Sequence, residues 1–259
     1  MSAAGNTFLL SLNLDPSQGP SLARAIAADS DGLILGSTSL PMMRMFNPDG
    51  SEAMCGNGLR CLVKLLSDSG HFESGGDVQT LDGPKKVFVE GDFVEAGMGE
   101  ARPLPGSSSL PSDPSILQIG NETFEGYSVF VGNPHWVLPA NSELQNRVAE
   151  LGPLLEKHER FPEGVNAEFA IYEKEGARVR VWERGAGETQ SCGTGALAVA
   201  SAGPNPIRPG ETRLIRYPGG ALSVRAGLEG TLFLGGRIVN EGFYEWREGE
   251  GLIPLREEI

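Results

Sequence analysis

Two polar, glycine-rich loops that each lead from a cysteine into an apolar helical pattern constrain the fold of this chain more than any other feature. The first loop, Asn47–Gly58, reads NPDGSEAMCGNG and contains Cys55. The second loop, Glu183–Ala196, reads ERGAGETQSCGTGA and contains Cys192. Because two of the three cysteines occupy matched places, the sequence favours a chain built from two related halves.

A cysteine at the start of a helix has a specific physical environment. The first backbone N–H groups of a helix have no intrahelical acceptor and carry the positive end of the helix dipole. That position is expected to lower the pKa of a thiol and to populate the thiolate. The same N–H groups can hold a carboxylate, and glycines after the cysteine let it approach the backbone closely. One such loop would suggest a cysteine nucleophile or an anion-binding turn, whereas two suggest a pair of thiols facing a single carboxylate.

The residues after the first loop predict an amphipathic helix. Its apolar positions recur at helical spacing: Leu59, Leu62, Val63 and Leu66. Its polar positions are expected on the opposite face: Arg60, Lys64 and Ser67. The third cysteine, Cys61, has no matching loop and is expected to be a packing residue.

The residues after the second loop predict a different kind of helix. Ala196–Ala202 has almost no polar side, which is typical of a helix buried all round. Short alternating stretches such as Arg178–Trp182 and Thr212–Tyr217 predict antiparallel strands around it. Strands wrapped around a helix make each half an α+β unit.

Length and composition suggest where the halves divide. The chain has 259 residues, which fits two halves of about 110 to 150 residues. The Pro/Ser-rich segment Arg102–Pro114 is the best candidate linker. The predicted halves are residues 1–112 with Cys55 and residues 113–259 with Cys192, and the C-terminal tail could return to the first half.

Charge and composition exclude several classes of function. The net charge of −13 argues against nucleic-acid binding, which needs a basic face. No run of 18 apolar residues is present, and Met1–Gly5 lacks the features of an export signal, so we expect a cytoplasmic protein with no membrane partner. Three cysteines, three histidines and no C-x-x-C motif make a disulfide framework or a metal site improbable.

Taken together, these motifs resemble the family of cofactor-independent diaminopimelate epimerases. The matching segments occur in the family's order along the chain: Gly5–Phe8 (GNTF), Asn47–Cys61 (NPDGSEAMCGNGLRC), Gly132–His135 (GNPH), Leu151–Asn166 (LGPLLEKHERFPEGVN), Glu183–Ala196 and Pro218–Gly220 (PGG). The resemblance implies two pseudo-symmetric halves, each of mainly antiparallel strands wrapped around a central helix. The halves would meet at a cleft with one cysteine from each helix N-terminus.

The resemblance also implies an isomerase that uses no cofactor. LL-2,6-diaminopimelate and its meso form would be interconverted, for lysine and cell-wall synthesis, by two catalytic cysteines, Cys55 and Cys192. One thiolate would remove the α-proton, and the opposite thiol would deliver a proton to the other face. Which of the two acts as the base would depend on the configuration of the incoming carbon. The family is commonly dimeric, which leaves a homodimer open.

Ten further residues are candidates to bind this small zwitterionic substrate. By the family pattern, Asn47 and Glu183 would hold the reacting ammonium, and the distal amino-acid end would be held by Asn6, Asn133, Asn166 and Arg184. The α-carboxylate would be held by backbone N–H groups of Gly56, Asn57, Gly193 and Thr194. Because the substrate has a net charge near zero, the acidic surface of the protein is no obstacle.

The residues leave some alternatives open. A racemase of the same fold could act on another amino acid such as proline or histidine, although proline-type enzymes have histidine where Asn57 stands. The two loops could instead form an anion-binding module without turnover. A cysteine hydrolase would need a histidine base near one thiol and would leave the second thiol unexplained. His135 is expected to be a structural histidine with satisfied hydrogen bonds.

Overall fold

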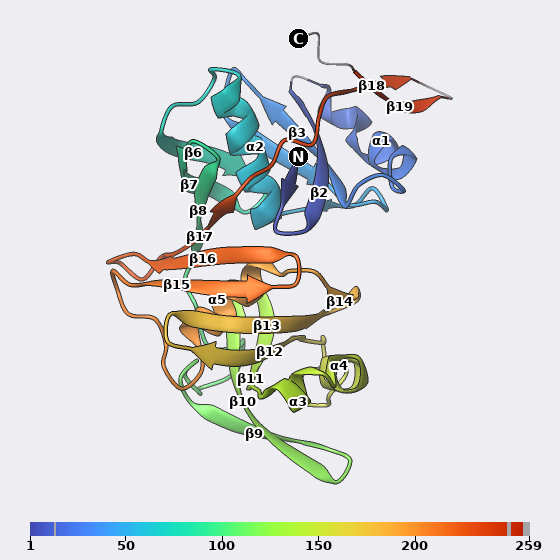
Figure 1. Cartoon of the computed structure of the whole chain (residues 1–259). Helices are drawn as coiled ribbons and strands as arrows, with labels where there is room; N and C mark the ends of the chain where they lie inside the picture. The colour runs from blue at the N-terminus through green and yellow to red at the C-terminus, as the bar shows by residue number, and fades with distance from the viewer. Residues whose placement is uncertain (13, 248–249, 256–259) are drawn as a thin grey trace. The chain divides into compact units, whose positions relative to one another are not determined.

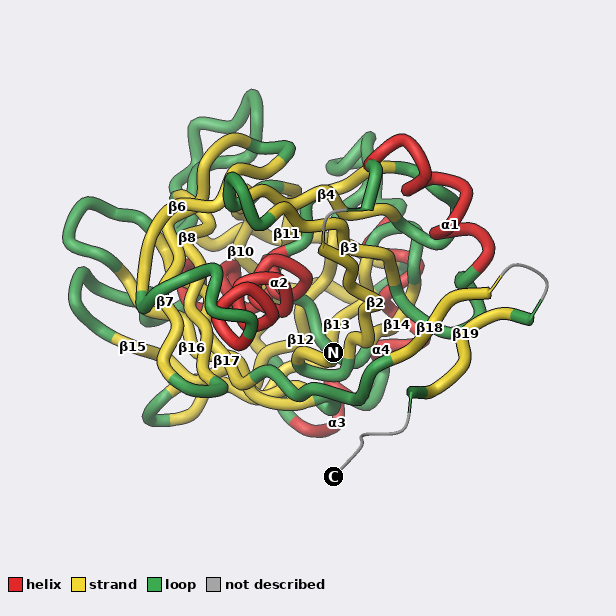
Figure 2. The backbone as a smooth tube through the Cα atoms, turned by 90° about the horizontal axis from the view of Figure 1, so that it is seen from above, coloured by secondary structure: helices red, strands yellow, loops and turns green. Residues whose placement is uncertain are grey.

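The chain folds into two compact units. The computed structural model describes residues 1–12, 14–247 and 250–255. The first unit combines Met1–Ala96 with the segment that begins at Arg237, and the second unit is Gly97–Gly236. Figures 1 and 2 show their elements from two directions. Within the described residues, no helix is long and apolar enough to cross a membrane.

The strands of the first unit pair mainly antiparallel. β3 pairs with β4, β6 with β7 and β7 with β8 in this way, whereas β2–β3 and β4–β6 are parallel. Close to the end of the described chain, β18 and β19 form a separate hairpin. The bounds are β1 (Ser2–Ala3), β2 (Asn6–Leu12), a 3-10 helix (Pro16–Gln18), α1 (Gly19–Ala25), β3 (Gly32–Ser37), β4 (Met42–Phe46), β5 (Glu52–Ala53), α2 (Gly56–Asp68), β6 (Gly75–Thr80), β7 (Gly83–Glu90), β8 (Phe93–Gly99), β18 (Tyr244–Arg247) and β19 (Gly251–Pro254).

Helix α2 is the centre of the first unit. It packs against β1, β2, β3, β4 and β7. The four predicted apolar positions are all buried, and so is Cys61, as expected for a packing residue. One prediction for this helix is wrong: Arg60 does not lie on a solvated polar face but is completely buried. Because strands surround the N-terminal part of α2 on several sides, every residue from Asn57 to Val63 is buried.

The second unit is also built mainly from antiparallel pairs, with parallel pairing of β11 with β12 and of β13 with β15. Its elements are β9 (Pro114–Ile119), β10 (Glu122–Val131), β11 (Asn133–Pro139), α3 (Ser142–Gln145), α4 (Val148–Glu156), β12 (Asn166–Glu173), β13 (Gly176–Glu183), β14 (Gly187–Thr189), α5 (Gly193–Ser201), β15 (Thr212–Tyr217), β16 (Gly220–Ala226) and β17 (Leu232–Arg237).

Helix α5 occupies the corresponding central place in the second unit. It contacts β10, β11, β12, β13, β15 and β16 (Figure 1), and residues 195–200 are all buried. The prediction of a helix buried all round is therefore confirmed. Small side chains make this possible, because a run of alanine and glycine lets strands approach the helix from several directions. The architecture of the chain is thus mixed α/β, with many strands and few helices.

Candidate active site

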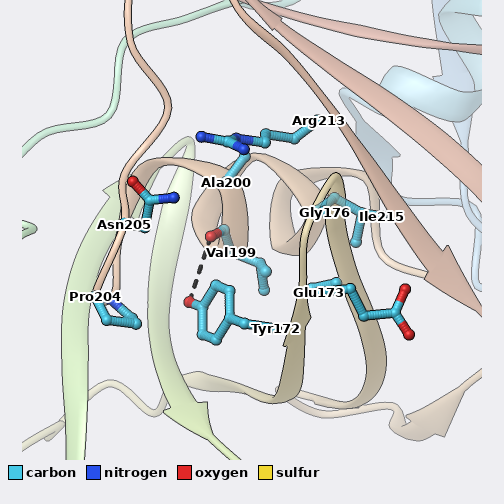
Figure 3. Close-up of a pocket in the computed structure, with 10 residues that line it drawn as sticks. Tyr172, Glu173, Gly176, Val199, Ala200, Pro204, Asn205, Arg213 and Ile215 are labelled. Atoms are coloured by element: carbon cyan, nitrogen blue, oxygen red, sulfur yellow. Dashed lines mark hydrogen bonds between the residues drawn. The ribbon is translucent and has the colours of Figure 1, made fainter.

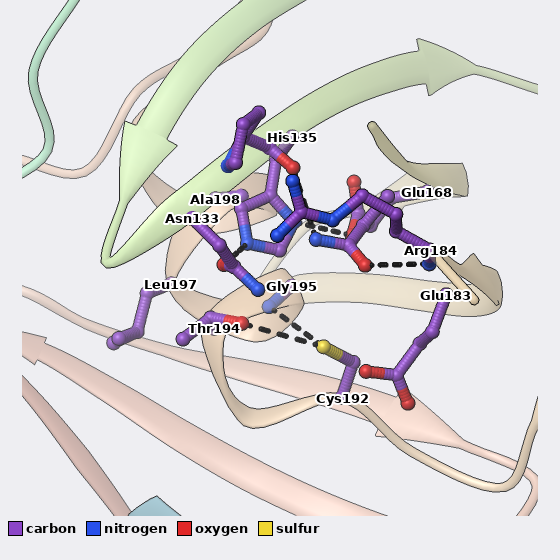
Figure 4. Close-up of polar contacts among 12 residues, drawn as sticks. Asn133, His135, Glu168, Glu183, Arg184, Cys192, Thr194, Gly195, Leu197 and Ala198 are labelled. Carbon is purple, nitrogen blue, oxygen red and sulfur yellow. Dashed lines mark hydrogen bonds and ion pairs between the residues drawn. The ribbon is translucent and has the colours of Figure 1, made fainter. Parts of the chain in front are cut away.

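Cys192 immediately precedes helix α5, and its side chain lies at the N-terminus of that helix. It is the N-cap residue in an extended conformation, and its side chain is only 4% exposed. Its Sγ accepts a hydrogen bond from the Gly195 N–H at 3.3 Å and lies 3.4 Å from Thr194 Oγ1 (Figure 4). The first helical bond runs from Ala196 N–H to the Cys192 carbonyl at 3.0 Å. The N–H groups of Gly193 and Thr194 therefore lie ahead of the helical ladder, where an anion can bind them.

The electrostatic environment of Cys192 is opposite to the one expected from the sequence. Burial raises the pKa of the Cys192 thiol well above its usual range, and the carboxylates of Glu183 and Glu168 raise this pKa further. The hydrogen bond with Thr194 lowers it, but by less. A helix N-terminus favours a thiolate, yet removal from water and two nearby carboxylates outweigh that effect. Cys192 is therefore a thiol at neutral pH and can donate a proton.

Glu183 lies beside this thiol at the end of β13. Its Oε1 accepts a hydrogen bond from Thr189 Oγ1 at 2.5 Å, and Figure 4 shows its carboxylate next to Cys192. Thr189 comes from β14, which pairs antiparallel with β13. The hairpin thus holds one carboxylate oxygen through a hydrogen bond, and the carboxylate also interacts with the Cys192 thiol.

The side chains of Glu168, His135 and Asn133 form a row of hydrogen-bonded polar groups, and Glu168 interacts with Cys192. His135 is completely buried and lies between two oxygens, with Nδ1 2.7 Å from Glu168 Oε1 and Nε2 2.6 Å from Asn133 Oδ1. This confirms the expectation of a histidine with satisfied hydrogen bonds. Glu168 is also fully buried, and burial raises its pKa. Neither Glu168 Oε2 nor the Tyr217 hydroxyl has a hydrogen-bond partner among the described residues.

Glu168 and Tyr217 were missed by sequence reasoning. Glu168 lies within the strand β12, where its neighbours Ala167 and Phe169 are buried on both sides. An acidic residue inside an apolar strand is a usable signal, because a buried carboxyl group needs partners or a raised pKa. Tyr217 carries no comparable local signal.

Asn166 and Arg184 are tied together through the backbone. The Asn166 side chain accepts a hydrogen bond from the Arg184 N–H at 2.9 Å and donates one to the Pro134 carbonyl at 2.9 Å. The Arg184 guanidinium in turn donates to the Glu163 carbonyl at 3.0 Å. Asn166 therefore orients the peptide that carries Arg184, and the roles of both residues at a substrate stay predictions.

Cys55 has the same relation to helix α2 in the first unit. It is the extended N-cap residue, half-buried, and its Sγ accepts a hydrogen bond from the Gly58 N–H at 3.5 Å. The first helical bond runs from Leu59 N–H to the Cys55 carbonyl at 2.9 Å. The N–H groups of Gly56 and Asn57 are again left ahead of the ladder, as those of Gly193 and Thr194 are in α5.

The remaining predicted residues of the first unit are near this helix end or in the loop before it. The Asn57 side chain is 3% exposed and donates to Asn6 Oδ1 at 2.8 Å, so these two residues lie together. Asn57 Oδ1 accepts a hydrogen bond from Arg60, which leaves its backbone N–H as the group it can offer a ligand. Asn47 closes the preceding loop, with its side chain 3.0 Å from Ser51 Oγ. Asn6 and Asn57 thus lie together at the start of α2, and Asn47 lies in the loop that precedes it.

A separate small cavity in the second unit contains none of these residues. It lies against the C-terminal part of α5, where the Tyr172 hydroxyl donates to the Val199 carbonyl at 3.5 Å (Figure 3). The same hydroxyl also donates to the Ala202 carbonyl at 3.1 Å. Glu173, Asn205 and Arg213 provide its polar lining. Its volume is about 60 Å³.

Comparison with solved structures defines the class of fold. A phenazine biosynthesis protein of the PhzF family from Bacillus anthracis superposes with a TM-score of 0.62 at 16% identity, covering 92% of each chain. A hydroxyproline epimerase from Agrobacterium vitis, solved with trans-4-hydroxy-L-proline, superposes with a TM-score of 0.61 at 17% identity, covering 89% of this chain and 80% of that one. The chain therefore has the fold that epimerases and PhzF-type proteins share.

Sequence relatives give a closer assignment. Diaminopimelate epimerases from Moorella thermoacetica and Geobacillus kaustophilus are 39% and 36% identical to the chain. These matches cover 78% of this chain and 81% of the first relative, and 96% of both chains for the second. The family model for diaminopimelate epimerase matches residues 127–237. The chain belongs to the diaminopimelate epimerase family, as its motifs predicted.

Proposed function

We propose that this chain is an isomerase that interconverts LL-2,6-diaminopimelate and meso-diaminopimelate by two-base proton transfer between Cys55 and Cys192. The relatives named diaminopimelate epimerase support the reaction. The observation that carries the mechanism is the matched geometry of the two cysteines. Each is an extended N-cap whose sulfur accepts the N–H of the third helical residue, and in each helix the N–H groups of the first two residues precede the helical ladder.

This geometry suits the inversion of an amino-acid carbon. The α-proton is very weakly acidic, so its removal without a cofactor requires electrostatic stabilisation of the carbanion in a site that excludes water. The N–H groups of Gly56, Asn57, Gly193 and Thr194 can hold the α-carboxylate, on which negative charge develops. Inversion also needs a proton donor and a proton acceptor on opposite faces of the carbon, which one residue cannot provide.

The substrate's other charged groups would be held by side chains from both units. By the family pattern, Glu183 and Asn47 would hold the reacting ammonium, and Asn6, Asn133, Asn166 and Arg184 would hold the distal amino-acid end. Asn166 contributes by orienting Arg184, to which its side chain is bonded. Arg184 suits a carboxylate because its planar guanidinium can bind both oxygens.

The proposal includes the organisation of the whole chain. Two pseudo-symmetric halves, 1–112 and 113–259 with the C-terminal tail returning to the first half, each wrap strands around a helix that starts at a catalytic cysteine. They form a cleft that brings the two sulfurs to opposite sides of one bound amino acid. The enzyme works without a cofactor, in the cytoplasm, as a homodimer, in the synthesis of lysine and peptidoglycan precursors.

The direct test is solvent exchange at the α-carbon. The reduced protein is incubated in D2O with LL-diaminopimelate or with single amino acids such as proline and histidine, and loss of the α-proton signal is followed by NMR. We expect exchange and formation of the meso isomer with diaminopimelate alone. Exchange only in a monoamino acid would replace the substrate, and no exchange in any of them would support an anion-binding module without turnover.

Two variants test the paired mechanism. Cys55→Ser and Cys192→Ser should each lower the rate of epimerisation by about 10²- to 10⁴-fold, because a hydroxyl is a far weaker acid than a thiol. Cys61→Ser is the matched control, because Cys61 is a buried residue in the interior of α2 and does not lie at the end of a helix. Wild-type activity in either of the first two variants would refute the paired-thiol mechanism.

A further inference from the structure

Arg60 is a buried cation that lacks an anionic partner in the described structure. Its side chain is completely buried in α2, and no Asp or Glu among the described residues pairs with it. One guanidinium nitrogen, Nη2, donates to Asn57 Oδ1, whereas Nε and Nη1 have no hydrogen-bond partner. Burial lowers the pKa of Arg60 to about 10, so the group is still a cation at neutral pH. A buried, unpaired charge is costly, which makes this placement unusual.

The position of the guanidinium relates it to Cys55. Side chains on a helix point back toward its N-terminus, and the bond to Asn57 places the Arg60 head group beside the first turn of α2. That turn already carries the positive end of the helix dipole. Two positive charges at the same end repel each other unless an anion lies between them, and Cys55 is the residue at that end that can become an anion.

The electrostatic interactions of Arg60 lead to the same residue. The pKa of Arg60 is raised by negative charge on Cys61 and on Cys55. Burial, however, raises the pKa of Cys61 itself to about 12, so Cys61 stays a thiol and offers no negative charge at neutral pH. Because the interaction between two charges is mutual, Arg60 favours negative charge on Cys55 as much as that charge favours protonated Arg60.

Other ionisable groups around α2 do not take this role. Of the strands packed against the helix, β1, β2 and β3 carry none within their bounds. On β4, Arg44 is bonded to Glu52, and Lys64 on α2 itself pairs with Asp68 and, at 3.3 Å, with Asp92. The other groups near the helix are Lys85, Lys86 and Glu90 on β7 and the Met1 ammonium, which interacts with Cys61 and Glu241.

The second unit has the opposite arrangement. Leu197 follows Cys192 at the same spacing at which Arg60 follows Cys55, and it is an apolar, fully buried residue. The charged groups that act on Cys192 are the carboxylates of Glu183 and Glu168. One cysteine is therefore accompanied by a buried cation, and the other by two carboxylates.

We propose that Arg60 is a positioning residue that holds Cys55 as a thiolate in the resting protein, while Cys192 rests as a thiol. Arg60 acts through the electrostatic field at the N-terminus of α2 and through its hydrogen bond to Asn57, which keeps the first turn in place. In the proposed epimerisation, on which this assignment of roles rests, Cys55 is then the base that the free enzyme presents first. After the proton transfers, Cys55 carries the proton and Cys192 is the thiolate.

The test measures the Cys55 thiol without any substrate. In a Cys61→Ala, Cys192→Ala background, Cys55 is the single thiol, and its thiolate is followed by ultraviolet absorbance and by the rate of alkylation as a function of pH. With Arg60 in place, we expect a titration midpoint below about 8.5, the ordinary value for cysteine. Arg60→Met should raise this midpoint by about one pH unit, which is a tenfold loss of thiolate at lower pH. Arg60→Lys, which keeps the charge, should shift it less.

The matched control is Lys64→Met, which removes one positive charge from the same helix where that charge is already paired with carboxylates. It should leave the midpoint unchanged. Equal midpoints with Arg60 and with Met at this position would overturn the proposal. If Arg60→Met does not fold, the titration midpoint of Cys55 in the Cys61→Ala, Cys192→Ala protein with Arg60 in place is the deciding measurement. A midpoint at or above about 8.5 would equally overturn the proposal.

In the enzyme with both catalytic cysteines, Arg60→Met should move the acid limb of kcat/KM to higher pH by the same amount. Lys64→Met should not move it. Because the thiol titration needs no substrate, a failure of diaminopimelate turnover and a failure of the Arg60 assignment give separate results.

Discussion

At the scale of single residues, the protonation state of each cysteine is decided by its neighbours more than by its place on a helix. Both sulfurs occupy N-caps, which favour a thiolate. Around Cys192, burial and the carboxylates of Glu183 and Glu168 raise the pKa of the thiol above its ordinary value. Both cysteines have the same place on a helix, yet the groups around Cys192 make it a proton donor. Because the side chains around Cys55 are different, Cys55 can serve as the proton acceptor.

This pKa shift predicts a dependence of stability on pH. In the unfolded chain the Cys192 thiol ionises near its ordinary pKa of about 8.5, whereas in the folded chain it holds its proton to higher pH. Between these two pKa values the folded state binds more protons than the unfolded state, so the free energy of unfolding falls as pH rises. One group contributes at most about 1.4 kcal/mol per pH unit.

The measurement is urea unfolding of the wild type and of Cys192→Ala from neutral pH upward. The difference in stability between the two proteins should be constant below about pH 8.5 and should then change in favour of the alanine variant. Taking the difference removes the contribution of Cys61, whose pKa is also raised by burial. A difference that does not vary with pH would contradict the assignment of Cys192 as a buried thiol.

At the scale of elements, the first turn of each cysteine helix is made by glycine for a steric reason. A Cβ added at Gly195 would lie 2.8 Å from Glu168 Oε1, 3.1 Å from the Tyr217 hydroxyl and 3.1 Å from Cys192 Cβ. All three atoms belong to well-packed, buried groups. A Cβ added at Gly58 in α2 would meet the Ile34 Cδ1 methyl at 2.8 Å, which is the end of a flexible side chain.

The two glycines therefore form a matched pair for mutation. Gly195→Ala should lower stability by about 1–3 kcal/mol through overpacking and should reduce epimerisation by displacing Cys192. Gly58→Ala should cost less, because Ile34 can change its rotamer. The gain in helix propensity, at most about 1 kcal/mol, is common to both changes. Denaturant midpoints and kcat/KM for the two variants test this, and an equal or larger effect of Gly58→Ala would refute it.

At the scale of the whole molecule, the proposed reaction requires one cysteine from each unit. Each unit presents one sulfur at a helix end beside two N–H groups that precede the helical ladder, but one such end is only half of an acid–base pair. The proposed cleft requires Cys55 and Cys192 to reach the two faces of one carbon atom. Thiols brought that close together can form a disulfide, for which the Cα atoms must come within about 7 Å.

Mild oxidation tests this arrangement. In the Cys61→Ala variant, treatment with a thiol oxidant should yield an intramolecular disulfide between Cys55 and Cys192, with loss of activity that a reductant restores. Peptide mapping by mass spectrometry identifies the bond. Bound diaminopimelate should slow its formation, because the proposed mechanism requires the substrate to separate the two sulfurs. If both thiols react with alkylating reagents but never with each other, the facing arrangement is wrong.

The sequence by itself determined the features that depend on neighbouring residues in the chain. The Cys-Gly-x-Gly turns lead into helices because N-cap geometry is local, and the alanine run of α5 is buried all round because such a segment has no polar side. The family motifs, which combine several of these local features, were sufficient to identify the family. Leu59, Leu62, Val63 and Leu66 were recognised as core residues because helical spacing alone places them on one face.

Only the tertiary structure decided which charges surround each sulfur. Arg60 is buried, against the amphipathic pattern, because strands cover α2 on more than one side. Glu168 reaches the Cys192 helix because β12 packs against α5, which no local pattern specifies. Burial and charge are sums over residues that are distant along the chain. The sequence therefore located the two thiols, but the folded units determine the protonation state in which Cys192 rests.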